Sequence, residues 1–334
     1  MPSSLARDPP EPMNALLPIL AVTVPFFALV LAGYVAGWRH LLPESAIPGL
    51  NAFVLYFALP CMLFRFGLNT PVGEALNPVV LAVYLACALL MVLVAIAFSL
   101  DEVVGLKDAS FGALVTAFPN TGFMGVPLLA ALFGPAIVGP MIATILIDMF
   151  VTSSLCIALA QVGGAAGGAR TAAMRSLRGA LSNPMPWAIA LGGALSALGW
   201  RPAGPVDAVI KMLADAATPV ALFTIGAVLW RAGQHAHTRT AHKRYVPQAL
   251  AKLLLHPALV FAVSLAARAA GAPLSDLQVM SITLTAALPS AANVAMLAER
   301  FGADNGRIAR IILLSTTLSF VTFTTLAWWF GAGR

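Results

Sequence analysis

The chain has 334 residues, of which 60% are hydrophobic and only 10% are charged, and its mean hydropathy is +0.90. Since soluble domains carry about 25% charged residues, this composition excludes a soluble globular protein and predicts an all-α protein that crosses a membrane several times. The net charge of +6 does not indicate nucleic-acid binding, because the basic residues lie in short loops between apolar segments, where they set orientation.

Residues 1–13 form a polar, proline-rich stretch that we expect to be a disordered tail, with Met13 as an alternative start. Ten apolar segments follow, and most have the length of about 20 residues that a transmembrane helix needs. Their ranges are 14–37, 47–67, 78–100, 109–133, 136–160, 182–199, 206–230, 247–270, 277–299 and 307–331. Cys61, Cys87 and Cys156 all fall within these segments and have no metal-binding spacing.

The fourth and ninth segments each contain a proline near their middle, in Phe118-Pro119-Asn120-Thr121-Gly122 and in Leu288-Pro289-Ser290. Proline removes a backbone donor and clashes with the carbonyl one turn earlier, so each segment should form two short helices. The part from Ala109 to Phe118 would be about 15 Å long, which is half of a hydrocarbon core of about 30 Å. Broken helices at matching places in two halves of a membrane protein indicate a transport site.

A glycine-rich stretch at 161–181 is typical of a flexible linker, and it divides the chain into a first repeat, 14–160, and a second, 182–334. The halves share short patterns in the same order. Gly37-Trp38-Arg39 returns as Gly199-Trp200-Arg201, Pro60 as Pro219 and Pro119 as Pro289, at offsets of 162, 159 and 170 residues. With five helices in each half, the second half starts on the opposite side of the membrane, so the pattern predicts a 5+5 inverted repeat.

The positions of Lys and Arg predict the orientation. With the N-terminus outside, 13 of the 19 basic residues lie on the inner side and 6 on the outer side. The inner residues are Arg39, Lys107, Arg170, Arg175, Arg178, Arg231, Arg239, Lys243, Arg244, Lys252, Arg300, Arg307 and Arg310. The positive-inside rule therefore predicts that both termini are periplasmic and that the linker is cytoplasmic.

Four stretches resemble the auxin efflux carrier family, which includes plant auxin exporters and bacterial permeases for malonate, malate and related acids. They are Pro119-Asn120-Thr121 with Met124-Gly125-Val126-Pro127, Leu181-Ser182-Asn183-Pro184, Leu213-Ala214-Asp215-Ala216 and Ala286-Ala287-Leu288-Pro289. The resemblance covers nearly the whole chain. The short linker is similar to that of the bacterial members, which implies a bacterial inner-membrane protein, and the implied architecture is akin to that of the bile-acid:sodium symporters.

The resemblance implies ten helices, of which helices 4 and 9 are broken and cross each other. Helices 1, 2, 6 and 7 would form a scaffold that can pair into a homodimer, and helices 3–5 and 8–10 a transport domain that moves by an elevator mechanism. Asn120 matches the family's crossover asparagine, which contacts a substrate carboxylate. The second crossover departs from the plant pattern, because Ser290-Ala291-Ala292-Asn293 replaces a glutamine-glycine sequence. The plant substrate and its coupling are therefore not carried over.

The two breaks also have a site chemistry of their own, because helix N-termini carry partial positive charge and unpaired N–H groups. The second half-helices should begin at about Asn120 and Ser290, both good N-cap residues, and should converge on an anion. Helix C-termini near Phe118 and Leu288 would meet at the same place and could hold a cation. Alternatively, the polar residues only satisfy backbone groups freed by the breaks. The candidate substrate-binding residues are Pro119, Asn120, Thr121, Gly122, Pro289, Ser290 and Asn293.

Asp148 lies within the apolar stretch Ile142–Ile157. A carboxylate inside the membrane is costly, so Asp148 is a candidate for carrying a proton or a cation, although a packing role is the alternative. Thr285 is a second candidate for ion coupling, to H+ or Na+, and no other cofactor and no metal is indicated. His256, directly before Pro257, is interpreted as a packed histidine.

The sequence has no HExxH, GxSxG or Walker motif, so an enzyme is not predicted and transport would run down existing gradients. The leading hypothesis is a secondary active transporter for a small organic anion, a carboxylate. The alternatives are a sodium-coupled symporter of the bile-acid type, and a membrane sensor or channel that binds the same ligand. A cluster of carboxylates and amides around the breaks would favour sodium.

Overall fold

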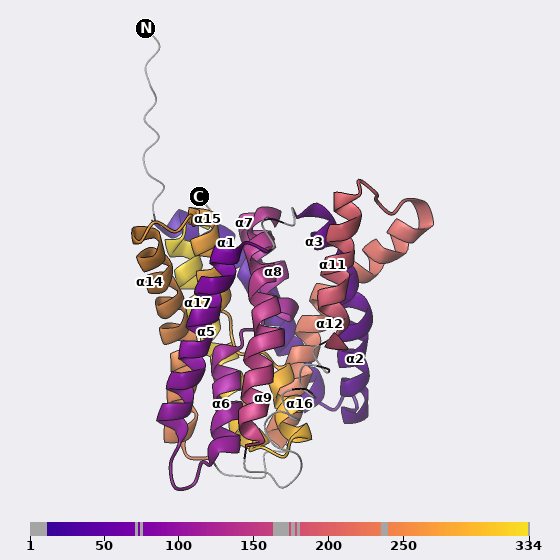
Figure 1. Cartoon of the computed structure of the whole chain (residues 1–334). Coiled ribbons are helices and arrows are strands. Elements are labelled where there is room, and N and C mark those ends of the chain that lie inside the picture. The colour runs from indigo at the N-terminus through magenta and orange to yellow at the C-terminus, as the bar shows by residue number, and fades with distance from the viewer. Residues whose placement is uncertain are drawn as a thin grey trace.

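The computed structural model describes residues 12–70, 73, 76–162, 174, 178, 181–234 and 240–332. These residues are helical apart from short connections, and the helices pack side by side in a bundle (Figure 1). Most of the predicted tail and most of the predicted linker lie outside the described residues.

The helices of the first half account for most of its described residues. They are α1 (Pro12–Trp38), η1 (Glu44–Ala46), α2 (Ile47–Phe53), η2 (Val54–Ala58), α3 (Leu59–Asn69), α5 (Pro78–Ser99), α6 (Leu106–Ala117), η3 (Thr121–Gly125), α7 (Val126–Phe133), η4 (Pro135–Ile137), α8 (Val138–Ile147), η5 (Asp148–Thr152) and α9 (Ser153–Ala160). Those of the second half are α11 (Pro184–Ala197), α12 (Gly204–Gln234), η6 (His242–Arg244), α13 (Val246–Leu250), η7 (Ala251–Leu255), α14 (His256–Ala269), α15 (Asp276–Ala286), α16 (Asn293–Arg300) and α17 (Asn305–Trp329).

Within the described part of the chain, seven helical segments are long and apolar enough to cross a membrane. They are Leu16–Trp38, Glu44–Asn69, Pro78–Ser99, Pro135–Ala160, Gly204–Gln234, Val246–Ala269 and Asn305–Trp329. The prediction of an all-helical, multi-pass membrane protein is therefore confirmed. Of the three other predicted segments, two are broken into short helices, and α11 has only 14 residues, which is about 21 Å.

The two broken segments are interrupted where their prolines predict. In the first, α6 ends at Ala117 and η3 begins at Thr121; in the second, α15 ends at Ala286 and α16 begins at Asn293. Figure 1 shows α6 and α16 toward one face of the bundle and α7 and α15 toward the opposite face. The two broken segments therefore run in opposite directions past each other.

Four π-helical turns, η2, η3, η5 and η7, interrupt the α-helices of the described residues. Three of them directly precede a helix whose second residue is a proline: Pro60, Pro127 or Pro257. A proline cannot donate to the regular ladder, so the wider turn accommodates the lost hydrogen bond. Such turns are frequent at functional sites, and here η5 begins with Asp148 and η7 contains Lys252.

Helices α1 and α12 approach so closely that only glycine fits between their backbones. A Cβ atom on Gly33 would lie 1.9 Å from the carbonyl oxygen of Phe223, and one on Gly226 would lie 1.9 Å from that of Val30. Small residues at such positions let transmembrane helices make close van der Waals contact. These glycines therefore fix the distance between the two helices.

The same contact recurs between α3 and α11. A Cβ atom on Gly192 would lie 2.3 Å from the carbonyl oxygen of Phe64, and one on Gly67 would lie 2.5 Å from that of Ile189. The two contacts are related by a shift of 159 residues along the chain. Gly33 and Val30 of α1 correspond to Gly192 and Ile189 of α11, and Gly67 and Phe64 of α3 correspond to Gly226 and Phe223 of α12. Pro60 and Pro219 are separated by the same 159 residues. We call Gly33, Gly67, Gly192 and Gly226 the glycine interface.

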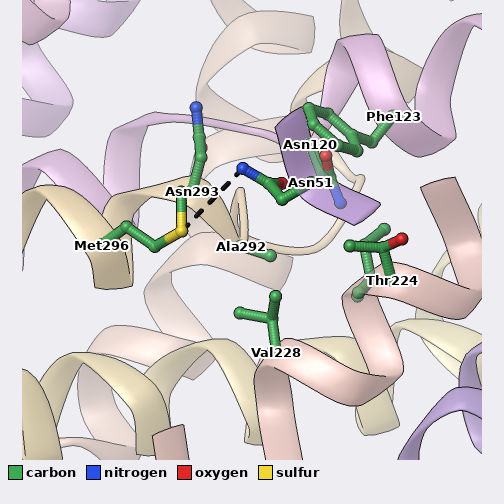
Figure 2. A pocket seen from close by; sticks show the side chains of 9 residues that line it. Asn51, Asn120, Phe123, Thr224, Val228, Ala292, Asn293 and Met296 are labelled. Carbon is green, nitrogen blue, oxygen red and sulfur yellow. Dashed lines mark hydrogen bonds between the residues drawn. The ribbon is translucent and has the colours of Figure 1, made fainter. Parts of the chain in front are cut away.

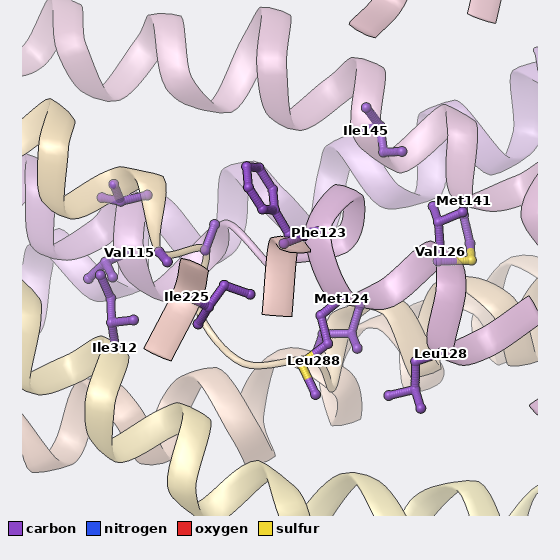
Figure 3. Close-up of a cluster of buried hydrophobic side chains, with 14 of the residues drawn as sticks. Val115, Phe123, Met124, Val126, Leu128, Met141, Ile145, Ile225, Leu288 and Ile312 are labelled. Carbon is purple, nitrogen blue, oxygen red and sulfur yellow. The ribbon is translucent and has the colours of Figure 1, made fainter. Parts of the chain in front are cut away.

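A large apolar core surrounds the two breaks (Figure 3). Met124 and Leu288, one from each broken segment, are both buried in it beside Ile225 of α12. A Cβ atom on Gly125 would lie 2.3 Å from Leu288 Cδ1, so the broken segments are in direct contact. Apolar packing therefore holds the two breaks together.

Candidate transport site

The two breaks are joined by backbone hydrogen bonds. Pro119 and Ser290 form an isolated antiparallel bridge. The Asn120 N–H donates to Pro289 O at 2.8 Å, and the Ala291 N–H donates to Phe118 O at 3.1 Å. Because every backbone polar group at membrane depth needs a partner, this pairing explains how two non-helical stretches persist inside the bundle.

The helix starts differ from the sequence prediction. Asn120 precedes η3, but its side chain makes no capping hydrogen bond, and α16 begins at Asn293 with Ala292 at its N-cap, three residues later than expected. The expected helix start at Ser290 is therefore wrong, whereas Asn120 does occupy the N-cap position and lacks only the capping hydrogen bond of its side chain. The physical reason is that the backbone of these residues pairs across the crossover instead of turning directly into a helix.

A small cavity of about 10 Å³, which has room for about one water molecule, lies against this crossover (Figure 2). One of its walls comes from the broken segments and contains Asn120, Phe123, Ala292, Asn293 and Met296; the other comes from α2 and α12 and contains Asn51, Thr224, Ile225 and Val228. The lining has amides and a hydroxyl but no charged side chain. An anion in this cavity would therefore meet amide dipoles and helix N-termini, with no fixed cation.

Several polar groups at the crossover are buried without a hydrogen-bond partner. They are Thr121 Oγ1, Ser290 Oγ and Asn293 Oδ1. Buried polar groups normally have a partner, so orphaned ones require an explanation. Asn51 Nδ2 has only a weak contact, 3.9 Å from the sulfur of Met296 (Figure 2). The crossover therefore keeps polar groups available for a ligand.

The other predicted substrate and coupling residues have more ordinary surroundings. Gly122 is half-buried, and a Cβ atom there would lie 3.3 Å from Met185 Cε of α11. Thr285 is fully buried, and its Oγ1 donates to Ser281 O one turn earlier in α15 at 2.7 Å. Its hydroxyl therefore stabilises its own helix in this conformation.

Asp148 is 1% exposed and lies on the π-helical turn η5. The Tyr84 hydroxyl donates to Asp148 Oδ2 at 2.9 Å, and the Thr152 hydroxyl donates to Oδ1 at 3.2 Å. Both carboxylate oxygens thus accept a hydrogen bond, which is what a buried carboxylate needs. Asp148 does not line the crossover cavity.

Lys252 contradicts one part of the sequence interpretation. We counted it among the loop residues of the inner side, but it lies in η7 and is 0% exposed. Its Nζ donates to Ala286 O at 2.8 Å and lies 3.0 Å from His256 Nδ1. Without Lys252, the count of basic residues that predicts the orientation becomes 12 on the inner side and 6 on the outer side.

The hydrogen-bonded pair of Tyr84 and Asp148 and the neighbouring pair of Lys252 and His256 belong to one group. The rings of Tyr84 and His256 lie with their centroids 6.1 Å apart, and Asp148 and Lys252 interact electrostatically. We call Tyr84, Asp148, Lys252 and His256 the polar cluster. It draws its members from α5, η5, η7 and α14, and its lysine reaches the last residue of α15.

Sequence reasoning found Asp148 but missed Lys252 and Tyr84 as its neighbours. The available signal was the spacing of Lys252 and His256, four residues apart within an apolar segment and directly before a proline. Residues four apart share a helix face, so a lysine and a histidine with that spacing point toward the same side of the helix. Asn51 and Thr224 gave no comparable signal, because single polar residues in apolar segments are common.

These two sites can do different chemistry. The crossover cavity offers neutral hydrogen-bond donors and helix N-termini, which suit a carboxylate. The polar cluster offers one acidic and one basic side chain in a dry interior, where a change of protonation has a large electrostatic effect. Ala286 connects them, because it ends the half-helix α15 that leads into the second break.

Comparison with known proteins gives a family for the chain. Residues 18–328 match the family described as "Membrane transport protein". A protein of Rhizobium meliloti (strain 1021) named "Putative malonate transporter" is 28% identical over 327 residues, which cover 94% of this chain and 97% of that protein.

Two other relatives extend the comparison. The "Uncharacterized transporter YfdV" of Escherichia coli (strain K12) is 24% identical over 91% of this chain and 94% of its own length. The "Auxin efflux carrier component 4" of Arabidopsis thaliana is 31% identical, but the match covers only 44% of this chain and 24% of the plant protein.

Proposed function

Since the chain belongs to the membrane transport protein family, the family of the auxin efflux carriers, and is a transporter, we propose that it is a secondary active transporter of a small carboxylate. The Rhizobium relative named for malonate suggests a short dicarboxylic acid as the first candidate. The carrier would move its substrate by alternating access and without an ATP site of its own.

The crossover cavity is the observation that carries this proposal. Asn120 and Asn293 project from the two broken segments into a space that α2 and α12 close on the other side (Figure 2). When the two walls of this cavity move apart, a short carboxylate would accept hydrogen bonds from the amide groups and lie near the starts of η3 and α16, where partial positive charge is concentrated. Pro119, Thr121, Gly122, Pro289 and Ser290 would shape the backbone around it.

The position of the cavity also supports an elevator mechanism. It lies between the crossover and the helices that the glycine interface holds in tight pairs, α1 with α12 and α3 with α11. These four helices would form the fixed scaffold, and α5 to α9 with α13 to α17 the moving transport domain. The offset of 159 residues between the two glycine contacts supports ten spans arranged as a 5+5 inverted repeat.

We place the protein in a bacterial inner membrane as a homodimer joined through the scaffold, with both termini periplasmic. Leu41 and Leu198 are both 78% exposed and lie on loops of opposite predicted sides. In a variant without native cysteines, a membrane-impermeant maleimide should label Leu198→Cys in intact spheroplasts but not Leu41→Cys. Labelling in the reverse order would invert the orientation.

Sodium coupling of the bile-acid type is the second candidate, because Thr285 directly precedes the end of α15 at a helix break and Asp148 is a buried carboxylate. Sodium sites need several oxygen ligands around one point. The hydroxyl of Thr285 is bound to its own helix, and the oxygens of Asp148 are bound to Tyr84 and Thr152. Sodium binding would therefore require these side chains to rearrange.

The deciding experiment is counterflow in proteoliposomes. Vesicles loaded with unlabelled malonate should accumulate labelled malonate transiently, and a panel of mono- and dicarboxylates should compete in order of affinity. Saturable counterflow identifies a carrier, linear flux without counterflow identifies a channel, and binding without flux identifies a sensor. Asn120→Ala, assayed in parallel, links the flux to the crossover cavity.

A further inference from the structure

Lys252 occupies a place that transporters commonly reserve for a cation. Its Nζ lies 2.8 Å from the carbonyl oxygen of Ala286, which is the last residue of the half-helix α15. Helix C-termini carry partial negative charge, and the carbonyl ends of broken transporter helices coordinate coupling ions. Here a side chain of the protein itself supplies the positive charge at that end.

The charged groups around Lys252 make the net charge of the polar cluster depend on whether Lys252 is protonated. The titratable side chains around Lys252 come from several helices. Asp148 lies on η5, and His256 lies on the same helical segment as Lys252. The remaining ones are Tyr84 and Cys87 on α5 and Cys156 on α9. An ammonium on Lys252 and a carboxylate on Asp148 leave the cluster neutral. If the ammonium loses its proton, one negative charge remains buried, and an unpaired buried charge is strongly unfavourable.

A second cavity lies beside the helical segment that carries Lys252, and no member of the polar cluster is among its lining residues. It has a volume of about 270 Å³, and Asp101, Lys243, Arg244 and Arg307 lie among its lining residues together with Gln248 and Ser99. Its inner lining includes Ala251 and Leu255, which flank Lys252 on η7, and Met91, one helical turn from Cys87. This cavity is separate from the one at the crossover, with which it shares no lining residue.

Polar groups continue from this cavity toward Lys252. Gln248 precedes Lys252 by one turn, and its Oε1 is buried without a hydrogen-bond partner. His256 follows Lys252 by one turn, and its Nε2 is likewise buried without a partner. Asp101 also lines this cavity, and backbone N–H groups of Val104 and Val103 and the nearby Arg244 lower the pKa of Asp101, so this carboxylate is ionised at neutral pH.

We propose that the polar cluster binds one proton that is transported together with the carboxylate, and that the ammonium of Lys252 replaces a sodium ion at the carbonyl end of α15. This inference rests on the proposed carrier function and specifies its coupling ion. On loading, hydronium transfers a proton to the Lys252 amine, which gives the ammonium and one water molecule. On release at the other side of the membrane, the ammonium returns that proton to water.

The coupling follows from electrostatics. The ammonium lies at the end of α15, and the carboxylate would lie beyond the break that follows it, at the start of α16 and η3. Opposite charges in a low-dielectric interior attract each other over such a separation. The bound anion therefore favours the protonated cluster, and the proton equally favours the anion, because coupling between two binding sites is reciprocal.

The test compares net uptake with exchange in proteoliposomes, using labelled malonate as the probe. With the membrane potential held at zero by potassium and valinomycin, an inward gradient of one pH unit should raise wild-type accumulation about tenfold, since one pH unit corresponds to a factor of 10 for one proton per anion. A sodium gradient should have no effect. Lys252→Met should lose the response to the pH gradient and retain counterflow, because exchange requires no net proton movement.

Two further variants separate coupling from folding. Lys211→Met removes a lysine whose side chain is 57% exposed and paired with Asp215, and it should respond to the pH gradient as the wild type does. The double variant Asp148→Asn/Lys252→Met removes both buried charges and should fold even if Lys252→Met alone does not. It should exchange malonate without a response to pH.

An NMR measurement without substrate distinguishes a failure of the carrier proposal from a failure of the proton-site proposal. The chain has only four lysines, Lys107, Lys211, Lys243 and Lys252. In purified protein labelled at the lysine side chains, one NMR signal should change with pH while the exposed lysines stay charged, and Lys252→Met should abolish it. If no acid is transported but this signal titrates, the carrier proposal fails and the proton site stands. Uptake driven by sodium, or a response to the pH gradient that survives in Lys252→Met, would overturn the proton site.

Discussion

The glycine interface and the polar cluster are both close helix contacts inside the membrane, but they are built in opposite ways. At the glycine interface, backbones meet with no side chain between them, and a Cβ atom would fall within 1.9–2.5 Å of a carbonyl oxygen. At the polar cluster, long side chains on π-helical turns fill the space between helices and hydrogen-bond across it.

This difference matches two mechanical requirements. A backbone contact has no rotamers and one acceptable distance, so the α1–α12 and α3–α11 pairs should move as rigid units. A hydrogen-bonded cluster of ionisable side chains has several arrangements that differ in proton number, so it can respond to pH and to a nearby anion. Rigid packing therefore characterises the proposed scaffold, and chemical switching the proposed transport domain.

Enlarging a glycine should disrupt the rigid contact most strongly. In Gly226→Val the new Cβ would lie 1.9 Å from Val30 O, and backbone cannot move aside cheaply, so we expect a loss of stability above about 4 kcal/mol, in the range of exceptional substitutions. Thermal unfolding in detergent measures it. Gly233→Val on the same helix is the control, because no atom of the described residues lies within 4 Å of its Cβ position. Equal melting temperatures for both variants would refute the rigid-contact interpretation.

Removing one charge from the polar cluster should have the next largest effect. Asp148→Asn removes the negative charge that offsets the buried Lys252 ammonium without touching it, so we expect a destabilisation of up to about 3 kcal/mol, the lower end for leaving a buried charge uncompensated. Asp148→Asn/Lys252→Met should be more stable than Asp148→Asn alone, since no unpaired charge remains. If the two single effects simply add in the double variant, the residues do not act as a pair. Full pH-dependent transport by Asp148→Asn would remove Asp148 from the coupling site.

Substitution of Asn120 should weaken substrate binding and leave both the glycine interface and the polar cluster nearly unchanged. A hydrogen bond to a charged group contributes about 1.5–3 kcal/mol, so Asn120→Ala should weaken malonate binding roughly 10- to 150-fold. Asn120→Asp should be worse, because it opposes an anion with a fixed negative charge. Asn69→Ala, on an exposed asparagine that pairs with Arg201, is the control for binding measurements by calorimetry. If Asn120→Asp binds as tightly as the wild type, the crossover holds a cation.

Thr285→Val should produce the smallest change. The hydroxyl donates to Ser281 O within its own helix, so its loss should alter stability by about 1 kcal/mol or less. The ratio of pH-driven uptake to exchange should stay constant in proteoliposomes. A selective loss of coupling in this variant would show that the Thr285 hydroxyl turns toward the ion in another state of the carrier, as the sequence hypothesis requires.

Sequence alone predicted the class of the protein and the location of its breaks. Composition excluded a soluble domain, since 60% hydrophobic residues cannot be buried in a chain of this size without lipid contact. Pro119 and Pro289 predicted the two interruptions, because the cost of proline inside a helix is a local property of the backbone. Asp148 was recognisable for a similar reason, as an isolated charge in an apolar segment.

Tertiary structure alone decided what those features contact. The start of α16 moved from Ser290 to Asn293, because each break pairs with the other through backbone hydrogen bonds that no local pattern encodes. Lys252 looked like a loop charge near the end of its segment, and only the packing of α15 and α14 around it shows a buried ammonium held by Ala286 O and His256. Local chemistry determines where a helix breaks, whereas the partners of a buried charge depend on helices that are distant in sequence.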